Sequence, residues 1–266
     1  MNRLATLALC TLALSASAQK LTPAKDIPPH GKAIVLFDGH NLDAFDCFLK
    51  NPPPPTDPKA NTVFQVKAPN ATFAIDHGLL HVAGAPFGFL LTRQSYSNYY
   101  LRAEFKWGEA THAPREGKAR DSGILFNVPP DLDASNLRVF PESLEFQITE
   151  GGTGDFWLTD GAAITPKDAP RVTGPTHGAV KSARFNEGPW QNVTGYRDPS
   201  GEVENPHGEW NLLEMVSTGT EVLLYVNGKL VNQGTDPSPA SGKILLQSEG
   251  AELFFRNVRL FPLKSH

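Results

Sequence analysis

Residues 143–157 carry polar side chains at a spacing that is typical of a binding or catalytic site. Side chains alternate across a β-strand, so Glu145 and Gln147 project together from one face of the predicted strand. Asp155 and Trp157 follow in a turn with three glycines, which permit tight backbone geometry. Carboxylates, amides and an aromatic ring suit a sugar. The alternative is an edge strand whose polar face is solvated and whose tryptophan packs in the core.

Two further predicted strands, residues 99–107 and 121–127, also have one apolar and one more polar face. Lys106 lies on the polar face of the first strand and Asn127 lies opposite the apolar face of the second. If both strands pair with the strand of Glu145 in one sheet, these side chains share a surface. The alternative is a solvated sheet face, on which charge pairs across strands contribute only a few tenths of a kcal/mol.

Eight histidines are spread along the chain, and no two of them occur at a metal-binding spacing such as His-Glu-x-x-His. A metal site would therefore be assembled from separate loops. His177 and His207 are the best candidates, because they lie in a long loop region near Trp190. A plain surface position is the alternative for each. The sequence contains no Gly-x-Ser-x-Gly motif, phosphate-binding loop or dinucleotide fingerprint.

The charge of the chain argues against nucleic acid or an anionic membrane as a partner. The formal net charge is −4, and the 24 Lys and Arg residues form no basic tract. A neutral ligand such as a carbohydrate fits this composition better.

Residues 1–18 have the order of a secretory signal peptide: a charged start, an apolar run, and then small residues ending at Ala18. The run is too short to span a bilayer, so we expect no transmembrane segment. Cleavage near Ala18 predicts a secreted or periplasmic protein. Only Cys47 then remains of the two cysteines, so no intrachain disulfide can form and stability must come from packing.

Strand signals dominate the chain and helical periodicity is scarce, which with 23 Gly and 23 Pro predicts an all-β fold with long loops. The dipeptide Asn227-Gly228 between alternating apolar residues is a strong hairpin signal, since both positions of a type I′ turn need positive φ. So many short strands require two packed sheets or a barrel. Long loops are predicted at about residues 51–58, 108–120 and 161–205.

The predicted strands are residues 33–37, 72–76, 79–83, 88–92, 99–107, 122–127, 144–149, 210–217, 221–226, 229–231, 243–248 and 253–260. We expect an N-terminal extension at residues 19–32 and a single β-sandwich domain at residues 33–266.

Four blocks of the sequence together resemble the 3-keto-disaccharide hydrolase domain family. They are residues 36–45, which begin Leu-Phe-Asp-Gly, residues 121–127, residues 144–148, and a C-terminal series at residues 208–211, 226–228, 242–247 and 255–259. The resemblance implies a concanavalin A-like jelly-roll β-sandwich, usually exported by bacteria that degrade glycans. It also implies cleavage of glycosides that carry a ketone at C3 of the sugar.

A C3 ketone acidifies the proton at C2, so a base can form an enolate that expels the C1 substituent, after which water may complete a net hydrolysis. The expected roles are Glu145 as base or metal ligand; His177 or His207 as acid or metal ligand; Lys106 or Arg102 beside the enolate; Asn127, Gln147, Asp155 and Gln247 on sugar hydroxyls; and Trp157 as a stacking platform. A divalent metal ion is left open as a cofactor.

Many relatives have arginine at the position of Asn127, and many have aspartate at the position of Thr149. We therefore expect residues 150–157 to carry this protein's own specificity. Three alternatives to a keto-sugar enzyme remain: a non-catalytic carbohydrate-binding module, a structural or adhesion domain, and an ordinary glycosidase. The last would need a second acid facing Glu145, from Asp155 or Glu150.

Overall fold

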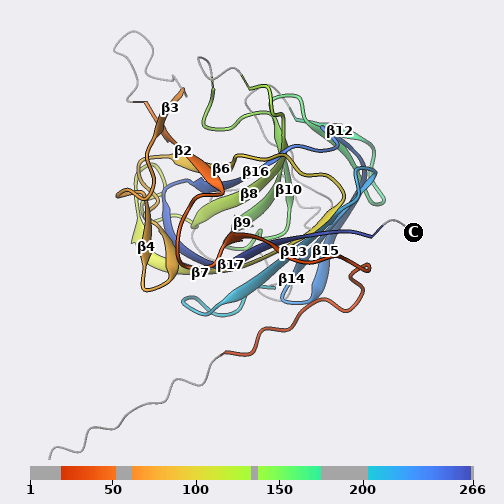
Figure 1. Cartoon of the computed structure of the whole chain (residues 1–266), viewed down its shortest axis with the longest axis horizontal. Helices are drawn as coiled ribbons and strands as arrows, with labels where there is room; N and C mark the ends of the chain where they lie inside the picture. The colour runs from red at the N-terminus through yellow and green to blue at the C-terminus, as the bar shows by residue number, and fades with distance from the viewer. Residues whose placement is uncertain (1–18, 52–61, 133–136, 175–202, 265–266) are drawn as a thin grey trace, which may run out of the picture.

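The computed structural model describes residues 19–51, 62–132, 137–174 and 203–264, and all regular elements in these ranges are strands (Figure 1). The strands form two sheets in which every described pairing is antiparallel. The predicted all-β sandwich is confirmed.

The larger sheet has ten strands in the described part of the chain. Nine follow one another in the order β12 (Val172–Thr173), β11 (Ala163–Pro166), β15 (Lys229–Ser238), β14 (Glu221–Val226), β13 (Asn211–Ser217), β7 (Tyr99–Thr111), β17 (Ala251–Pro262), β5 (Leu79–Val82) and β4 (Phe73–Asp76), and β1 (Ile34–Phe37) pairs with β17 off this path.

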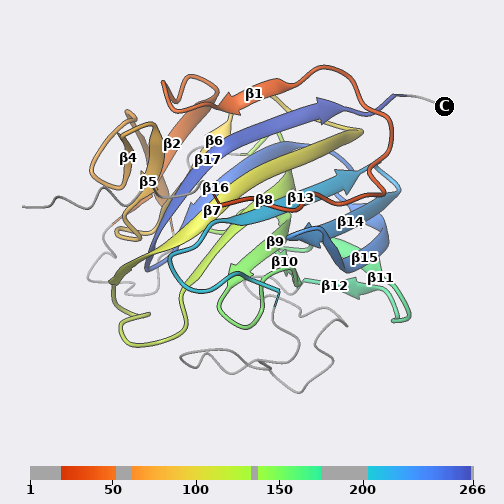
Figure 2. The same cartoon turned by 90° about the horizontal axis from the view of Figure 1, so that it is seen from below.

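The smaller sheet has seven strands in the described part. Their order is β10 (Phe156–Thr159), β9 (Ser143–Thr149), β8 (Asp121–Val128), β16 (Lys243–Ser248), β6 (Gly88–Thr92), β2 (Phe45–Lys50) and β3 (Val63–Val66). Figure 2 shows the two layers from the side of the larger sheet.

The core lies between the two sheets. Phe105 and Phe255 of the larger sheet and Ile124 and Phe146 of the smaller sheet are fully buried members of one apolar cluster. Because side chains alternate along a strand, the residues between these core positions on β8 and β9 must face away from the core. The smaller sheet therefore presents a second face, which is where Glu145 and Gln147 lie.

The hairpin prediction is confirmed, since Asn227 and Gly228 join β14 to β15 with φ values of 50° and 79°. Most predicted strands also match within a few residues. Five short strands were missed, β2, β3 and β10 to β12, because they are brief and lie beside or within segments rich in turn residues. The predicted loop at residues 108–120 starts later than expected, because β7 continues to Thr111. Of the predicted loop at residues 161–205, the part 175–202 lies outside the described residues.

The expectation that residues 99–107 join the sheet of Glu145 is wrong. These residues belong to β7, which pairs with β13 and β17 in the larger sheet. The ammonium group of Lys106 lies 5.3 Å from the ring centres of both Trp210 and Phe254. Lys106 therefore packs on aromatic neighbours of the larger sheet and shares no surface with Glu145.

Residues 19–32 lie against the outer face of the larger sheet, beside β13 and β14 (Figure 2). The Ala24 N–H donates a hydrogen bond of 2.7 Å to Oε2 of Glu214 on β13, and the Tyr100 hydroxyl donates to Oε1 of the same carboxylate. Ala24 and Ile27 pack on the apolar group around Tyr100. A fully buried carboxylate is costly unless it is hydrogen-bonded, so this segment and Tyr100 together stabilise Glu214.

Replacing Tyr100 by Phe removes one donor from this buried carboxylate and should lower the free energy of unfolding by about 1–3 kcal/mol. Urea unfolding at neutral pH measures the change. Tyr96→Phe is a matched control, because Tyr96 contacts Tyr99 through its ring. Equal stability of the Tyr100→Phe variant and the unaltered protein would show that the Tyr100 hydroxyl does not stabilise Glu214.

Candidate functional site

The polar residues of β9 face away from the core together with residues of β8 and β10. Glu145 is paired with Leu125 of β8 and with Trp157 of β10, and Gln147 is paired with Gly123 of β8. Residues that are paired across neighbouring strands project to the same face. The expectation that Glu145 and Gln147 project from one face agrees with the register, which also puts Trp157 on that face.

An arginine from the loop after β7 joins this face. Nη2 of Arg115 forms ion pairs with Asp121 at the start of β8 and, at 3.0 Å, with Oε1 of Glu249 in the turn after β16. The amide of Gln147 donates a hydrogen bond of 3.1 Å to Oδ1 of Asp121. We call Arg115, Asp121, Glu145 and Glu249 the carboxyl cluster, since it combines three carboxyl groups with one guanidinium.

An apolar cluster covers part of the same face. Phe89 and Leu91 of β6 pack with Leu137 and Val139, which come from the segment before β9. This apolar cover confines the polar groups to β8, β9, β16 and the adjoining turns. Apolar surroundings have a low effective dielectric constant, so the charges of the carboxyl cluster interact more strongly than they would in water.

Burial and mutual repulsion alter the proton affinity of the cluster. Only 5% of Glu145 and 2% of Asp121 are exposed. Burial raises the pKa of Glu145 well above its ordinary value; Glu249 and Asp121 raise it further, and Arg115 opposes the shift. Burial, followed by the charge of Glu249, likewise raises the pKa of Asp121. Glu145 therefore holds a proton at pH values where an exposed glutamate is ionised, which is the behaviour of a group that exchanges protons with a substrate.

Arg115 stays charged in this environment. Burial alone would lower the pKa of its guanidinium, but Asp121 and Glu249 outweigh that effect and raise it. The site therefore presents a permanent cation beside a carboxyl group that tends to be neutral.

Several buried polar atoms around the cluster have no hydrogen-bond partner among the described residues. They include two donors, Nη1 of Arg115 and Nε2 of Gln247, and three acceptors, Oε1 of Glu145, Oε1 of Gln147 and Oε1 of Gln247. Buried polar atoms in proteins are nearly always paired, because an unpaired one costs about 1–3 kcal/mol. Five such atoms on neighbouring elements indicate a site built to hydrogen-bond a polar ligand.

The structure places Gln247 on β16, which β8 separates from β9, and the register puts it on the same face as Gly123 and Gln147. Asp155 lies in the turn before β10, where it is 1% exposed and its backbone oxygen accepts a hydrogen bond from the Gln147 N–H. Asn127 lies at the end of β8 with a φ of 58°, and its amide donates a bond of 2.8 Å to the Pro239 oxygen. The described contact of Asn127 thus ties β8 to the loop before β16.

Of the two predicted histidines, His207 is not part of the cluster. His207 contacts Oε1 of Glu109 at 3.2 Å, near the end of β7 in the larger sheet. His177 lies outside the described residues. Glu145 and His207, the two candidate metal ligands, therefore have different surroundings. In the described ranges no three His, Cys, Asp or Glu side chains are grouped so that they could hold a metal ion.

Sequence reasoning missed Arg115 and the role of Asp121. Asp121 could have been found, because it alternates with Gly123 and Asn127 and so lies on the less apolar face of the predicted strand. Arg115 lies within the irregular loop between β7 and β8, and no pattern in the sequence places its side chain beside Asp121.

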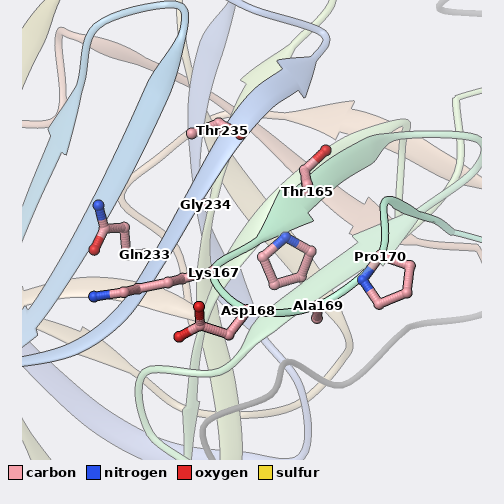
Figure 3. A pocket seen from close by; sticks show the side chains of 9 residues that line it. Thr165, Lys167, Asp168, Ala169, Pro170, Gln233, Gly234 and Thr235 are labelled. Atoms are coloured by element: carbon pink, nitrogen blue, oxygen red, sulfur yellow. The ribbon is translucent and has the colours of Figure 1, made fainter.

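A separate hollow of about 510 Å³ lies at the edge of the larger sheet, where the turn after β11 meets β15 (Figure 3). Its lining includes Lys167 and Asp168 of that turn and Gln233 of β15, and the side chains of Lys167 and Gln233 lie next to each other in Figure 3. None of its lining residues belongs to the carboxyl cluster, so it is a different surface.

No helix in the part of the chain that the structure describes is long and apolar enough to cross a membrane.

Comparison with known proteins identifies one family. The family model described as the 3-keto-alpha-glucoside-1,2-lyase-like domain matches residues 32–260. A comparison with curated proteins finds no match.

Solved structures with a similar fold include the following three proteins. A protein of Parabacteroides distasonis, provisionally described as a glycosyl hydrolase, is 16% identical with a TM-score of 0.52 over 87% of this chain and 94% of its own. An endo-β-galactosidase of Clostridium perfringens that releases GlcNAcα1-4Gal is 9% identical with a TM-score of 0.51 over 94% of this chain and 66% of its own. A Zobellia galactanivorans protein solved with laminaritriose and laminaritetraose is 10% identical with a TM-score of 0.50 over 88% and 98%. At these identities the likeness shows the fold.

The raised pKa of Glu145 predicts a pH-dependent stability. The folded chain binds this proton more strongly than the unfolded chain, so the free energy of unfolding falls as pH rises above 4.5, the ordinary value, toward the raised pKa. Glu145→Gln removes this pH-dependent loss of stability, because glutamine does not ionise. At neutral pH the Tm of the variant should exceed that of the unaltered protein by roughly 2–4 °C, the shift that about 1 kcal/mol gives in a chain of this size.

The difference in Tm should shrink below pH 4.5, where the glutamate is protonated in both states. Thermal unfolding followed by circular dichroism across this pH range measures it. A Tm difference that is constant with pH would contradict the raised pKa.

Proposed function

Since the chain belongs to the family of 3-keto-alpha-glucoside-1,2-lyase-like domains, we propose that it cleaves glycosides whose sugar carries a ketone at C3. Family membership makes it a carbohydrate-active, glycosyl hydrolase-like domain. The observation that supports the narrower proposal is the carboxyl cluster, in which a buried carboxyl group with a raised pKa lies beside a guanidinium that has an unpaired N–H.

Glu145 is the proposed base. The C3 ketone acidifies the C2 proton, and the ionised form of Glu145 accepts that proton while the C2–H electrons form the enolate. When the enolate collapses, the C3 carbonyl re-forms, a C1=C2 double bond appears and the C1–O bond breaks. The departing oxygen then takes a proton, which protonated Glu145 can return. The products are an unsaturated keto sugar and an alcohol, and addition of water across C1=C2 gives net hydrolysis.

Arg115 is the proposed stabiliser of the enolate. Its Nη2 is held by Asp121 and Glu249, while Nη1 is buried and has no hydrogen-bond partner in the described part. A fixed, charged donor aimed at a developing oxyanion lowers the barrier, because it needs no reorganisation during the reaction. Arginine can only donate, so Nη1 is suited to the carbonyl oxygen at C3.

The two glutamine oxygens complete the proposed substrate contacts. Oε1 of Gln147 and Oε1 of Gln247 are buried acceptors, and sugar hydroxyls are donors that would satisfy them. Trp157 is paired with Glu145 across β9 and β10 and is partly exposed, and its ring is the proposed stacking platform for a sugar.

The test is to incubate the purified protein with a 3-keto-glucoside and with its unoxidised parent, each with and without divalent metal ions. The proposal predicts release of the aglycone from the keto sugar only, because the parent has no acidified C2 proton. Absence of release under every condition would refute it. Binding of the sugar without turnover would identify a carbohydrate-binding module instead.

Variants sharpen the same assay. Glu145→Gln should lower kcat by about 10²–10⁴-fold, the usual contribution of a general base. Arg115→Met should lower kcat by about 10²–10³-fold, as for other oxyanion donors. Lys106→Met is the matched control, since Lys106 is also a partly buried cation but belongs to the larger sheet. Equal losses in all three variants would contradict the assigned roles.

A further inference from the structure

Two glycines are in close contact with the two side chains that have proposed catalytic roles, Glu145 and Arg115. We propose that Gly123 and Gly250 are positioning residues, which set the places of Glu145 and Arg115 because neither glycine carries a Cβ. This inference rests on the proposed function for its kinetic consequences, but the contacts themselves can be tested without a substrate.

Gly123 lies in the middle of β8, on the face that carries Glu145. A Cβ on Gly123 would overlap Oε1 of Glu145 and lie 2.7 Å from its Cδ and 2.9 Å from its Cγ. The Glu145 side chain therefore lies flat across β8, in the space that any other residue at position 123 would fill. A glycine weakens a strand interior, so its presence here is explained by the close approach of this carboxyl group.

Gly250 lies in the turn between β16 and β17, next to Glu249. Its φ is +84°, and a Cβ there would lie 2.7 Å from Cγ and 3.1 Å from Cβ of Arg115. The loop is fixed on the same turn by the backbone, since the His112 N–H donates a bond of 2.7 Å to the Gly250 oxygen. The aliphatic part of the Arg115 side chain thus packs against Gly250, and this contact fixes the position of the guanidinium relative to Glu249 and Asp121.

The two glycines act on different groups. An alanine at position 123 displaces the carboxyl of Glu145, while an alanine at position 250 displaces the arginine. At position 123 the clash is with the far end of the Glu145 side chain, so the carboxyl group moves before the fold is disturbed. At position 250 the clash is with Cγ and Cβ of Arg115, and the backbone oxygen of His112 is 3.2 Å away, so the loop that carries Arg115 must shift as well. Misplacing a reacting group by about 1 Å can cost about 10²-fold in rate.

Gly123→Ala should therefore lower kcat by about 10²-fold and change KM less, and it should shift the limb of the pH–rate profile that reports the ionisation of Glu145. Gly31→Ala is the control, because a Cβ at Gly31 meets nothing closer than 3.5 Å. Gly250→Ala should also lower kcat, but the Glu145 limb of the pH–rate profile should shift less than in Gly123→Ala. Its control is Gly208→Ala, which has a similar φ of +82° and nothing within 4 Å, so it carries the same backbone strain.

A double-mutant cycle tests the Gly123 contact independently of activity. We compare the midpoints of urea unfolding of Gly123→Ala, Glu145→Ala and the double variant. The alanine at position 123 should lower the midpoint only while the Glu145 side chain is present, so the two effects should be strongly non-additive. If the single variant does not fold, the double variant should still fold, because it lacks the clash.

Additive effects in this cycle, or an unchanged kcat and pH profile in Gly123→Ala, would overturn the proposal. Non-additivity in a protein that cleaves no 3-keto-glycoside would support the positioning contact and count against the proposed function alone. The two ideas can therefore fail separately.

Discussion

The structure depends on the burial of three carboxyl groups around one guanidinium. Asp121 and Glu249 form ion pairs with Arg115. Burial, together with the negative charges of Glu249 and Asp121, raises the pKa of Glu145. Burying charges in this way is costly unless they are paired, so the site does not contribute to stability in the manner of the apolar core. The sheet beneath it positions its members, and it combines a carboxyl group with a raised pKa and a guanidinium that remains charged.

The sandwich provides that rigidity through its two layers. Phe146 lies between Glu145 and Gln147 in the sequence and is buried in the core, so each polar residue on the outer face is fixed by an apolar neighbour on the inner face. The larger sheet closes the core from the other side, and residues 19–32 lie across its outer face. The cluster itself is drawn from the loop after β7, β8, β9 and the turn after β16, and it brings Arg115 together with Glu249, which is 134 residues away in the sequence.

The sequence predicted the parts of this site that follow from local alternation. Glu145, Gln147 and Gln247 lie on their expected face, because period-2 alternation and the neighbouring apolar residues determine it. Alternation does not determine which strands pair, so Lys106 was expected beside Glu145 although β7 belongs to the other sheet. Arg115 arrives on an irregular loop, where its place depends on long-range ion pairs. The reason for Gly123, a carboxyl group lying over it, likewise appears only in three dimensions.

The central claim is that Glu145 removes the C2 proton of a 3-keto sugar, and the most direct measurement is the isotope content of the product formed in D₂O. The account predicts deuterium at C2 of the released, hydrated keto sugar, detected by NMR, in excess of the exchange seen when the same keto sugar is incubated with Glu145→Gln. A product that keeps its original proton at C2 would show that the glycosidic bond breaks without an enolate, and would contradict the account.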